Sequence, residues 1–244
     1  MDSYELRIQY ELSRWKQKVM SESNFFQTSA KKVQLKIQSL LPEQIQEVLT
    51  QTVRNMMTLF MGGSSVFSGG SEEYEALSLR ERDSILEKKL NEYKKISAVE
   101  GAGTGAGGLL LGLADFPLLM GIKIRFLVEA AKIYGYSPKE ELERQFMLYI
   151  FQLAFSSDSH RKKVFQVIES WEDKVDEKPQ VNWDQLQQEY RDHIDLAKLL
   201  QLVPIIGAPV GAYVNYQLLE QLGETAKNAY RLRYMKRKDD QDYI

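Results

Sequence analysis

Apolar residues recur at helical spacing along most of this chain. Near the start they occur at every third or fourth position, the spacing that places side chains on one face of a helix. These residues are Tyr4, Ile8, Leu12, Trp15 and Val19. A second stretch, opened by Pro42 in a position typical of a first helical turn, repeats the pattern with Ile45, Val48, Leu49, Met56 and Phe60. The pattern therefore predicts two helices before residue 62.

Helix start and stop signals follow in the middle of the chain. Ser78 and Glu81 have the spacing of a capping box, in which side chains bond the free backbone N–H groups of a first turn. Gly135 is suited to end a later helix in the left-handed conformation. The residues after it form another start signal, which consists of Ser137, Pro138 and Glu140. Further helices are predicted over 159–174, 183–202 and 209–237.

No segment alternates between apolar and polar residues at period two, as a half-buried strand would. The predicted fold is therefore all-α, a single multi-helix bundle. Residues 62–76 hold four glycines and four serines and are predicted to be a flexible linker. They separate N-terminal helices at 1–61 from a helical core at 77–238, which we expect to form one domain with those helices. Residues 239–244 form a tail.

A glycine-rich run, EGAGTGAGGLLLGLADFPLLMG, occupies residues 100–121. Gly103, Gly105 and Gly108 satisfy the G-x-G-x-x-G pattern of dinucleotide-binding loops, but that loop must follow a buried strand, and the residues before it favour a helix. In a helix, four glycines fall within roughly 60° of one another. These are Gly101, Gly105, Gly108 and Gly112. The run therefore predicts a tightly packed central helix, and Gly207 and Gly211 predict a second one.

The same run also permits contact with a membrane. Residues 101–122 carry a single charge, Asp115, and are about long enough to span a bilayer. Asp115 and Pro117 lie well inside the run, which disfavours spanning. The uncharged stretch at 199–219 contains two internal prolines. Insertion, peripheral contact and burial in a water-soluble core all remain open from the sequence.

Composition narrows the chemistry. A net charge of −2 gives no overall attraction to nucleic acid, and the absence of cysteine excludes disulfides, thiolate metal sites and cysteine nucleophiles. Asp158 with His160, and His193 with its acidic neighbours, lack the spacing of metal ligands and are expected at the surface near helix ends. No nucleophile motif is present. We expect no metal, no cofactor and no catalytic residue.

Four polar residues stand in apolar surroundings and are candidates for a ligand site or a core polar network: Asp115, Arg125, Glu129 and Asn215. Arg125 and Glu129 lie one turn apart on the helix predicted at 117–134. They either form an ion pair at the edge of the core, or Arg125 holds Asp115 or a ligand anion such as a lipid phosphate. Asn215 is expected to face inward, where it bonds exposed backbone or a ligand.

The last helix ends in RLRYMKRK, residues 231–238. Its basic residues form a candidate patch for anionic lipid head groups: Arg231, Arg233, Lys236, Arg237 and Lys238. The stretch also permits contact with nucleic acid, but one short basic segment followed by DDQD is weak evidence for that. A solvated helix end is the remaining alternative, because positive charge is favourable at a helix C-terminus.

The stretches SAVEGAGTGAGGLLLGLADFPLLMGIKIRFLVEAAKIYGY and LVPIIGAPVGAYVNYQLLEQLGETAKNAYR resemble the EcsC protein family, over about residues 97–235. The family pattern is a glycine-rich run, a proline, a helix with an arginine, a Tyr-Gly helix end and Pro-x-x-Gly-x-x-x-Gly-x-x-x-Asn. It falls on Gly101, Gly105, Gly108, Pro117, Arg125, Tyr134, Gly135, Pro204, Gly207, Gly211 and Asn215. Pro209 departs from the pattern.

The resemblance implies a bacterial protein that faces the cytoplasm and works near an ABC transporter, since the family is named after a protein encoded beside the subunits of one. It implies no particular reaction. We therefore expect a non-enzymatic accessory protein, peripheral on the inner face of the cell membrane, with transporter subunits or anionic lipid as partners. The alternative is a lipid or small-molecule binding protein, or an enzyme, with a pocket between the glycine-rich helices.

Overall fold

The structure is a computed structural model and describes residues 2–21, 43–62, 65–105, 116–173, 181–186, 188–189 and 207–242. All regular elements in these residues are helical, which confirms the all-α fold class for this part of the chain. The elements are α1 (Ser3–Met20), α3 (Glu43–Gly62), η1 (Ser65–Phe67), η2 (Glu72–Tyr74), α4 (Leu79–Gly105), α6 (Phe116–Ile133), α7 (Glu141–Ala154), α8 (Asp158–Glu169) and α10 (Gly207–Asp242).

Local sequence signals account for several helix boundaries. Glu81 accepts hydrogen bonds from the backbone N–H and the hydroxyl of Ser78, at 2.8 and 2.7 Å, so the predicted capping box is confirmed. Gly135 follows α6 with φ +86, the left-handed conformation predicted for it. The stripe on α1 faces the core, where Ile8, Leu12 and Trp15 are buried.

Other boundaries differ from the predictions. α7 begins at Glu141, and its N-cap residue Glu140 makes no side-chain cap hydrogen bond. Ser137 instead closes a turn, in which its carbonyl accepts from the Glu140 N–H at 3.1 Å. α10 begins at Gly207 and includes Pro209, which its first turn tolerates because N–H groups there lack helical partners.

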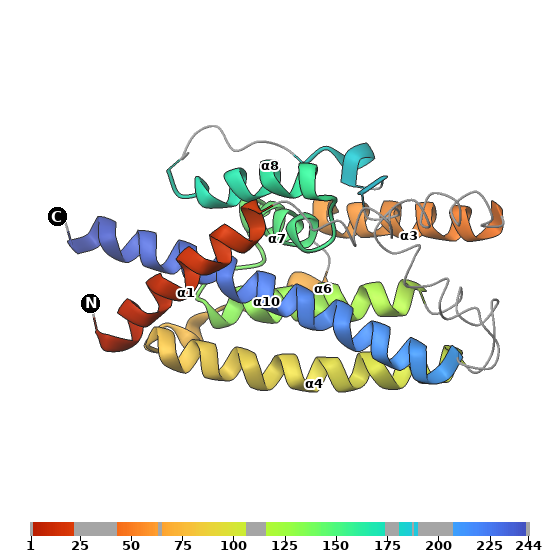
Figure 1. Cartoon of the computed structure of the whole chain (residues 1–244), viewed down its shortest axis with the longest axis horizontal. Coiled ribbons are helices and arrows are strands. Elements are labelled where there is room, and N and C mark those ends of the chain that lie inside the picture. Colours follow the sequence, from red (N-terminus) through yellow and green to blue (C-terminus); the bar gives the residue numbers. More distant parts are fainter. Residues whose placement is uncertain are drawn as a thin grey trace.

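The long helices α4 and α10 lie side by side and antiparallel, with α6 against both (Figure 1). Paired residues along α4 and α10 show the register: Ser97 with Asn215, Lys94 with Glu220, Glu87 with Lys227 and Asp83 with Arg231. α7 and α8 contact α10 from a different side, and α1 contacts both α10 and α8. α10 therefore lies between the α1 and α4 side and the α7 and α8 side.

Aromatic rings fill the core around Tyr230 of α10. Its ring stacks on Tyr134 and Tyr136, with centroids 5.4 and 5.5 Å apart, and meets Phe146 edge-on at 5.4 Å. Part of the segment at 62–76 also reaches the core, since Phe67 of η1 is buried against Phe60 of α3 at 5.0 Å. The proposed domain boundaries themselves stay predictions.

Only part of the glycine-rich run is described. α4 continues through Gly101 and Gly105, and α10 includes Gly207 and Gly211, whereas Gly108, Gly112 and Asp115 lie outside the described residues. Tight packing of these glycines stays a prediction. A close helix contact does occur at Gly223 of α10, where an added Cβ would lie 2.4 Å from the Leu90 side chain of α4. Within the described helices, none is long and apolar enough to cross a membrane.

We expect Gly223→Ala to lower the free energy of unfolding by about 1 kcal/mol. Alanine favours a helix interior by up to about 1 kcal/mol, but overpacking against Leu90 costs about 1–3 kcal/mol. Gly121→Ala in α6 is the matched control, because an added Cβ there meets nothing within 4 Å. It should stabilise the protein by up to about 1 kcal/mol. Chemical denaturation measures both, and equal stabilisation by both variants would contradict a close contact at Gly223.

Candidate functional site

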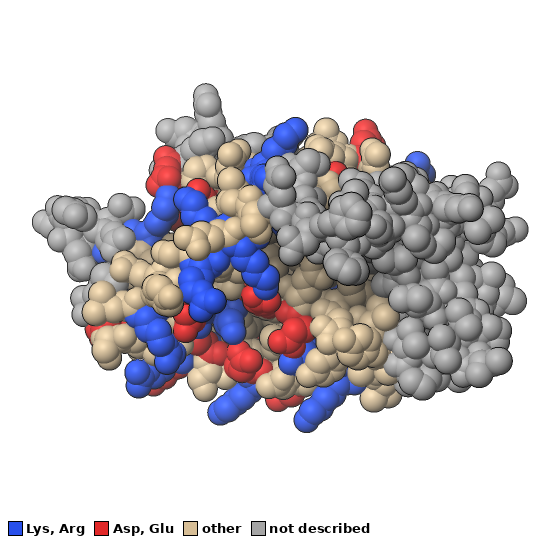
Figure 2. All heavy atoms as spheres, in the orientation of Figure 1, with Lys and Arg blue, Asp and Glu red and all other residues tan. Residues whose placement is uncertain are grey.

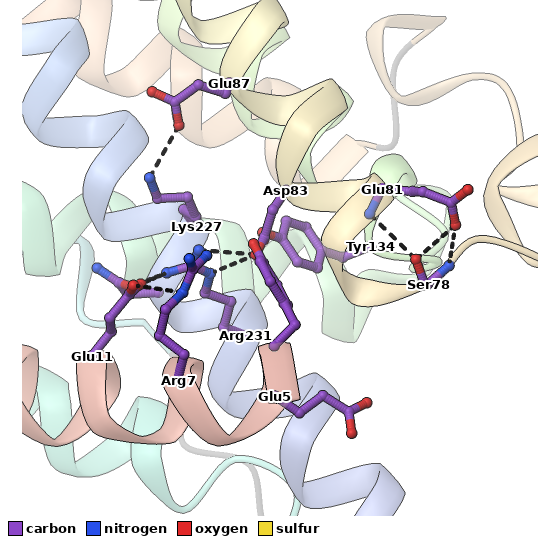
Figure 3. Close-up of polar contacts among 12 residues, drawn as sticks. Glu5, Arg7, Glu11, Ser78, Glu81, Asp83, Glu87, Tyr134, Lys227 and Arg231 are labelled. Carbon is purple, nitrogen blue, oxygen red and sulfur yellow. Dashed lines mark hydrogen bonds and ion pairs between the residues drawn. The ribbon is translucent and has the colours of Figure 1, made fainter. Parts of the chain in front are cut away.

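Arg231 of α10 joins a largely buried polar network with residues from α1 and α4 and with Tyr134, which directly follows α6 (Figure 3). Its Nε and Nη2 donate to Asp83 Oδ2 at 3.0 and 2.9 Å, and its Nη1 donates to Glu11 at 3.0 Å. Tyr4 and Tyr134 donate their hydroxyls to the same Asp83 carboxylate. One carboxylate therefore connects α1, α4, α10 and the residue that follows α6.

Two of the donors in this network, Arg231 and Tyr134, have raised pKa values. Burial acts to lower the pKa of Arg231, but its hydrogen bonds with Asp83 and the charge of that residue outweigh burial, and the pKa is raised. Burial, with the Asp83 charge, raises the pKa of Tyr134 well above its usual value. Tyr134 therefore stays a protonated donor to Asp83, and Arg231 stays a cation.

A second network lies on the other side of α10. Arg233 donates to Glu143 of α7 and to Glu172, both at 2.6 Å, while its guanidinium stacks 3.8 Å from the ring centroid of Tyr136. Tyr230 donates its hydroxyl to Glu143 at 2.6 Å. Burial raises the pKa of Glu143, and the Arg233 charge opposes that shift.

These two networks have the contacts of structural sites. General acid–base catalysis needs a titratable group that can reach a substrate. Here Asp83 and Glu143 accept several charge-assisted hydrogen bonds, and Arg231 and Arg233 donate along both edges of their guanidinium groups. Because the internal partners occupy these groups, neither network offers an open position for a ligand.

The predicted surface position of the C-terminal basic patch is wrong for two of its five residues. Arg231 and Arg233 are buried, because residues two apart on a helix point to nearly opposite sides and α10 is covered on both. Lys236 pairs with Asp173 at 2.5 Å, and Lys238 pairs with Glu5 at 2.6 Å. Arg237 is exposed, with its guanidinium 5.2 Å from the Tyr136 ring centroid. Figure 2 shows basic and acidic side chains interleaved on the described part of the face it draws.

The polar residues predicted to cluster do not all meet. Arg125 is exposed, and Glu129 pairs with Lys132 at 3.7 Å instead of with Arg125. Asn215 is buried as predicted, and its backbone oxygen accepts a hydrogen bond from Ser97 at 3.4 Å. Asp115 lies outside the described residues.

His160 is buried, although the sequence suggested a surface position. Its ring nitrogens lie 3.1 Å from Gln152 Oε1 and 2.9 Å from Gln185 Nε2, and burial lowers its pKa. A neutral imidazole between two amides is a satisfied core residue. Within the described ranges, no three His, Asp or Glu side chains gather as metal ligands would.

Lys123 of α6 was missed by the sequence analysis. It is 3% exposed, and among the described residues no hydrogen bond or ion pair engages its ammonium group. The group lies 5.9 Å from the centroid of the Phe155 ring. Burial lowers its pKa from 10.5 to about 8. The available signal was a lysine inside an otherwise apolar helical stretch, but sequence alone does not tell whether such a lysine extends to the surface.

Residues 7–235 match the sequence model of the EcsC protein family. The chain is 44% identical over 229 residues to "Protein EcsC" of Bacillus subtilis (strain 168), covering 94% of this chain and 95% of that protein. It is 30% identical over 166 residues to "Uncharacterized protein YdbA" of the same strain, covering 66% of this chain and 61% of that protein. No solved structure matches the chain.

We expect Arg231→Met to lower the free energy of unfolding by about 3–5 kcal/mol, because it leaves the buried Asp83 carboxylate without its cation. Adding Asp83→Leu should restore part of this loss, since the unpaired charge is removed. Lys227→Met is the control: Lys227 forms a more exposed ion pair with Glu87 at 3.1 Å and should cost less than about 1 kcal/mol. Denaturant unfolding of the wild type, Arg231→Met, Asp83→Leu and the double variant measures the coupling, and additive losses would contradict it.

We expect Lys123→Met to stabilise the protein at pH 7 by up to about 3 kcal/mol, from the fall of the lysine pKa from 10.5 to about 8. Below pH 8 both the folded and the unfolded wild type carry the proton, so the folded state bears the full cost of burying the charge. Between pH 8 and 10.5 the folded state has lost this proton while the unfolded state keeps it, so wild-type stability rises. The difference between the two proteins should therefore shrink across this window.

Chemical denaturation at several pH values measures this difference. Subtracting the free energy of unfolding of Lys123→Met from that of the wild type cancels the contribution of the tyrosines that also titrate at high pH. A difference that stays constant from pH 7 to pH 10.5 would show that Lys123 is not buried as a charge.

Proposed function

This chain belongs to the EcsC protein family, and we propose that it acts as a non-enzymatic accessory protein at the cytoplasmic membrane surface, associated with an ABC transporter system. The transporter association rests on the family resemblance. The surface location rests on where exposed apolar side chains lie on the described helices.

Five large apolar side chains are exposed at one end of the α4, α6 and α10 bundle. They are Ile96 and Val99 near the end of α4, Leu118 near the start of α6, and Tyr213 and Tyr216 near the start of α10. These three helix ends lie together at the right of Figure 1. We call these five residues the apolar tip. Two sequence stretches of low charge contain or adjoin these residues along the chain: 101–122, in which Asp115 is the single charge, and 199–219, which carries none.

The apolar tip has the composition of a membrane-interface contact. Tyrosine combines an apolar ring with a polar hydroxyl and is enriched where proteins meet the head-group region, while aliphatic side chains favour the acyl region below it. Val99 and Tyr213 are 71% and 65% exposed. Leaving such groups in water forgoes the free energy that burial in lipid would provide. This exposure is the observation that carries the proposal.

A lipid or small-molecule binding function is the second candidate. The observation that favours it is the buried amide of Asn215, whose Nδ2 has no hydrogen-bond partner within the described part of the protein. An unsatisfied buried donor is costly, and a ligand acceptor would remove that cost.

We expect Val99→Asp with Tyr213→Asp to weaken binding to phosphatidylglycerol vesicles by about tenfold or more. Full burial of one such side chain is worth about 1.5–3 kcal/mol, and tenfold corresponds to about 1.4 kcal/mol. Co-sedimentation with vesicles at low salt measures the partition of the protein into the lipid fraction.

The matched control is Leu6→Asp with Tyr10→Asp on α1, where the side chains are 58% and 66% exposed but lie away from the apolar tip. It adds the same two charges and should leave binding unchanged. No vesicle binding by the wild type, or equal losses for the two double variants, would contradict the proposal.

A further inference from the structure

Lys123 projects from the middle of the buried face of α6. At 100° per residue, Leu119, Leu127 and Ala130 lie within roughly 40° of it around the helix, and all three are buried. Arg125 and Glu129 lie toward the outer side. The lysine therefore projects from the buried side of α6 and not from its exposed side.

This ammonium group lacks the partner that its burial demands. Charged side chains are rarely buried unless they are paired, because the loss of hydration is costly. The other buried cations discussed above have acidic partners: Arg231 has Asp83 and Arg233 has Glu143. Within the described residues Lys123 has only the ring of Phe155, at 5.9 Å. That contact is at the outer limit of a cation–π interaction.

Asn215 supplies a second unpartnered donor at the same level of the bundle. Tyr93 of α4 contacts Phe126 of α6, and Ser97 of α4 bonds Asn215 of α10. From Tyr93 to Ser97 is about 6 Å along α4, and from Phe126 to Lys123 is about 4.5 Å along α6. Because α4 and α6 run antiparallel, Ser97 and Lys123 both lie nearer to the apolar tip than the contact between Tyr93 and Phe126 does. Lys123 and Asn215 are each 3% exposed, on helices that contact one another.

We propose that Lys123 and Asn215 bind one monovalent oxyanion group, a carboxylate or a phosphodiester, carried on an apolar body, between α6 and α10. Both protein groups are hydrogen-bond donors, so they suit an acceptor that has no proton to donate. One ammonium balances one negative charge. The side chains around Lys123, including Leu119, Leu127 and Phe155, suit a hydrocarbon body and not a freely hydrated ion.

The site gives a ligand class to the second candidate function, and it does not depend on membrane binding. The lowered pKa of Lys123 agrees with an ammonium group that lacks a counter-charge, because burial without a compensating anion is its cause. A bound anion would supply that charge and raise the pKa again.

Isothermal titration calorimetry with dodecanoate tests the proposal on the full-length protein. We expect saturable binding at pH 7, with dodecanol and acetate binding at least about tenfold more weakly, because each lacks either the charge or the apolar body. Lys123→Met and Asn215→Leu should each weaken dodecanoate binding by about tenfold or more. Lys88→Met, which removes an exposed lysine from α4, should bind as the wild type does.

Proton uptake gives a readout that a general loss of packing would not produce. At pH 8 about half of the Lys123 side chains are neutral, so binding an anion should take up about half a proton per ligand. Titrations in two buffers of different ionisation enthalpy measure this uptake. It should disappear in Lys123→Met.

Repeating the titration with lysophosphatidylglycerol shows whether the site prefers a phosphodiester or a carboxylate. Binding of either ligand that depends on Lys123 supports the proposed site. Dodecanol binding as tightly as dodecanoate, equal dodecanoate binding by wild type and Lys123→Met, or no saturable binding of either anion would overturn the proposal. Vesicle co-sedimentation of Lys123→Met should match the wild type. The failure of this site and the failure of the membrane contact are therefore separate results.

Discussion

The pairing of Asp83 with Arg231 is the interaction on which the arrangement of the helices depends. The Asp83 carboxylate accepts from Arg231 of α10, Tyr134 just after α6 and Tyr4 of α1, and it is itself on α4. Burying a carboxylate is costly unless its hydrogen-bond donors and its cation are all correctly positioned. Sliding any of these helices by one turn would leave a charge or a hydroxyl unpaired, so the network favours one register over its neighbours.

The two networks also explain how arginines from a strongly basic helix segment are buried inside the protein. Arg231 contacts Asp83 and Glu11 on one side of α10, and Arg233 contacts Glu143 and Glu172 on the other. The helix is thereby joined by charge to both layers around it. Its cations neutralise internal acids, which leaves less positive charge to attract a membrane than the residue count suggests.

The two ends of the helices α4 and α10 therefore differ in how well their polar groups are paired. The end that holds residues 83 and 231 contains hydrogen-bonded charges, whereas the opposite end carries the apolar tip and, just inside it, the buried Lys123 and the unsatisfied amide of Asn215. Satisfied groups stabilise the fold but have no capacity left for a ligand. Exposed apolar surface and unpaired buried donors are features that binding would improve, and the apolar tip and Asn215 bring both to this second end.

The sequence by itself determined what depends on neighbours in the chain: the helical stripe of α1, the Ser78 and Glu81 capping box, the helix end at Gly135, and the all-α class. These features need contacts across no more than a few residues. Tertiary structure alone decided that Arg231 and Arg233 are buried, that Gly223 meets Leu90, and that Lys123 faces the core. Asp83 lies 148 residues before Arg231, and Glu143 lies 90 residues before Arg233. Whether a charge is buried depends on which distant segment packs against it, and helical periodicity carries no record of that choice.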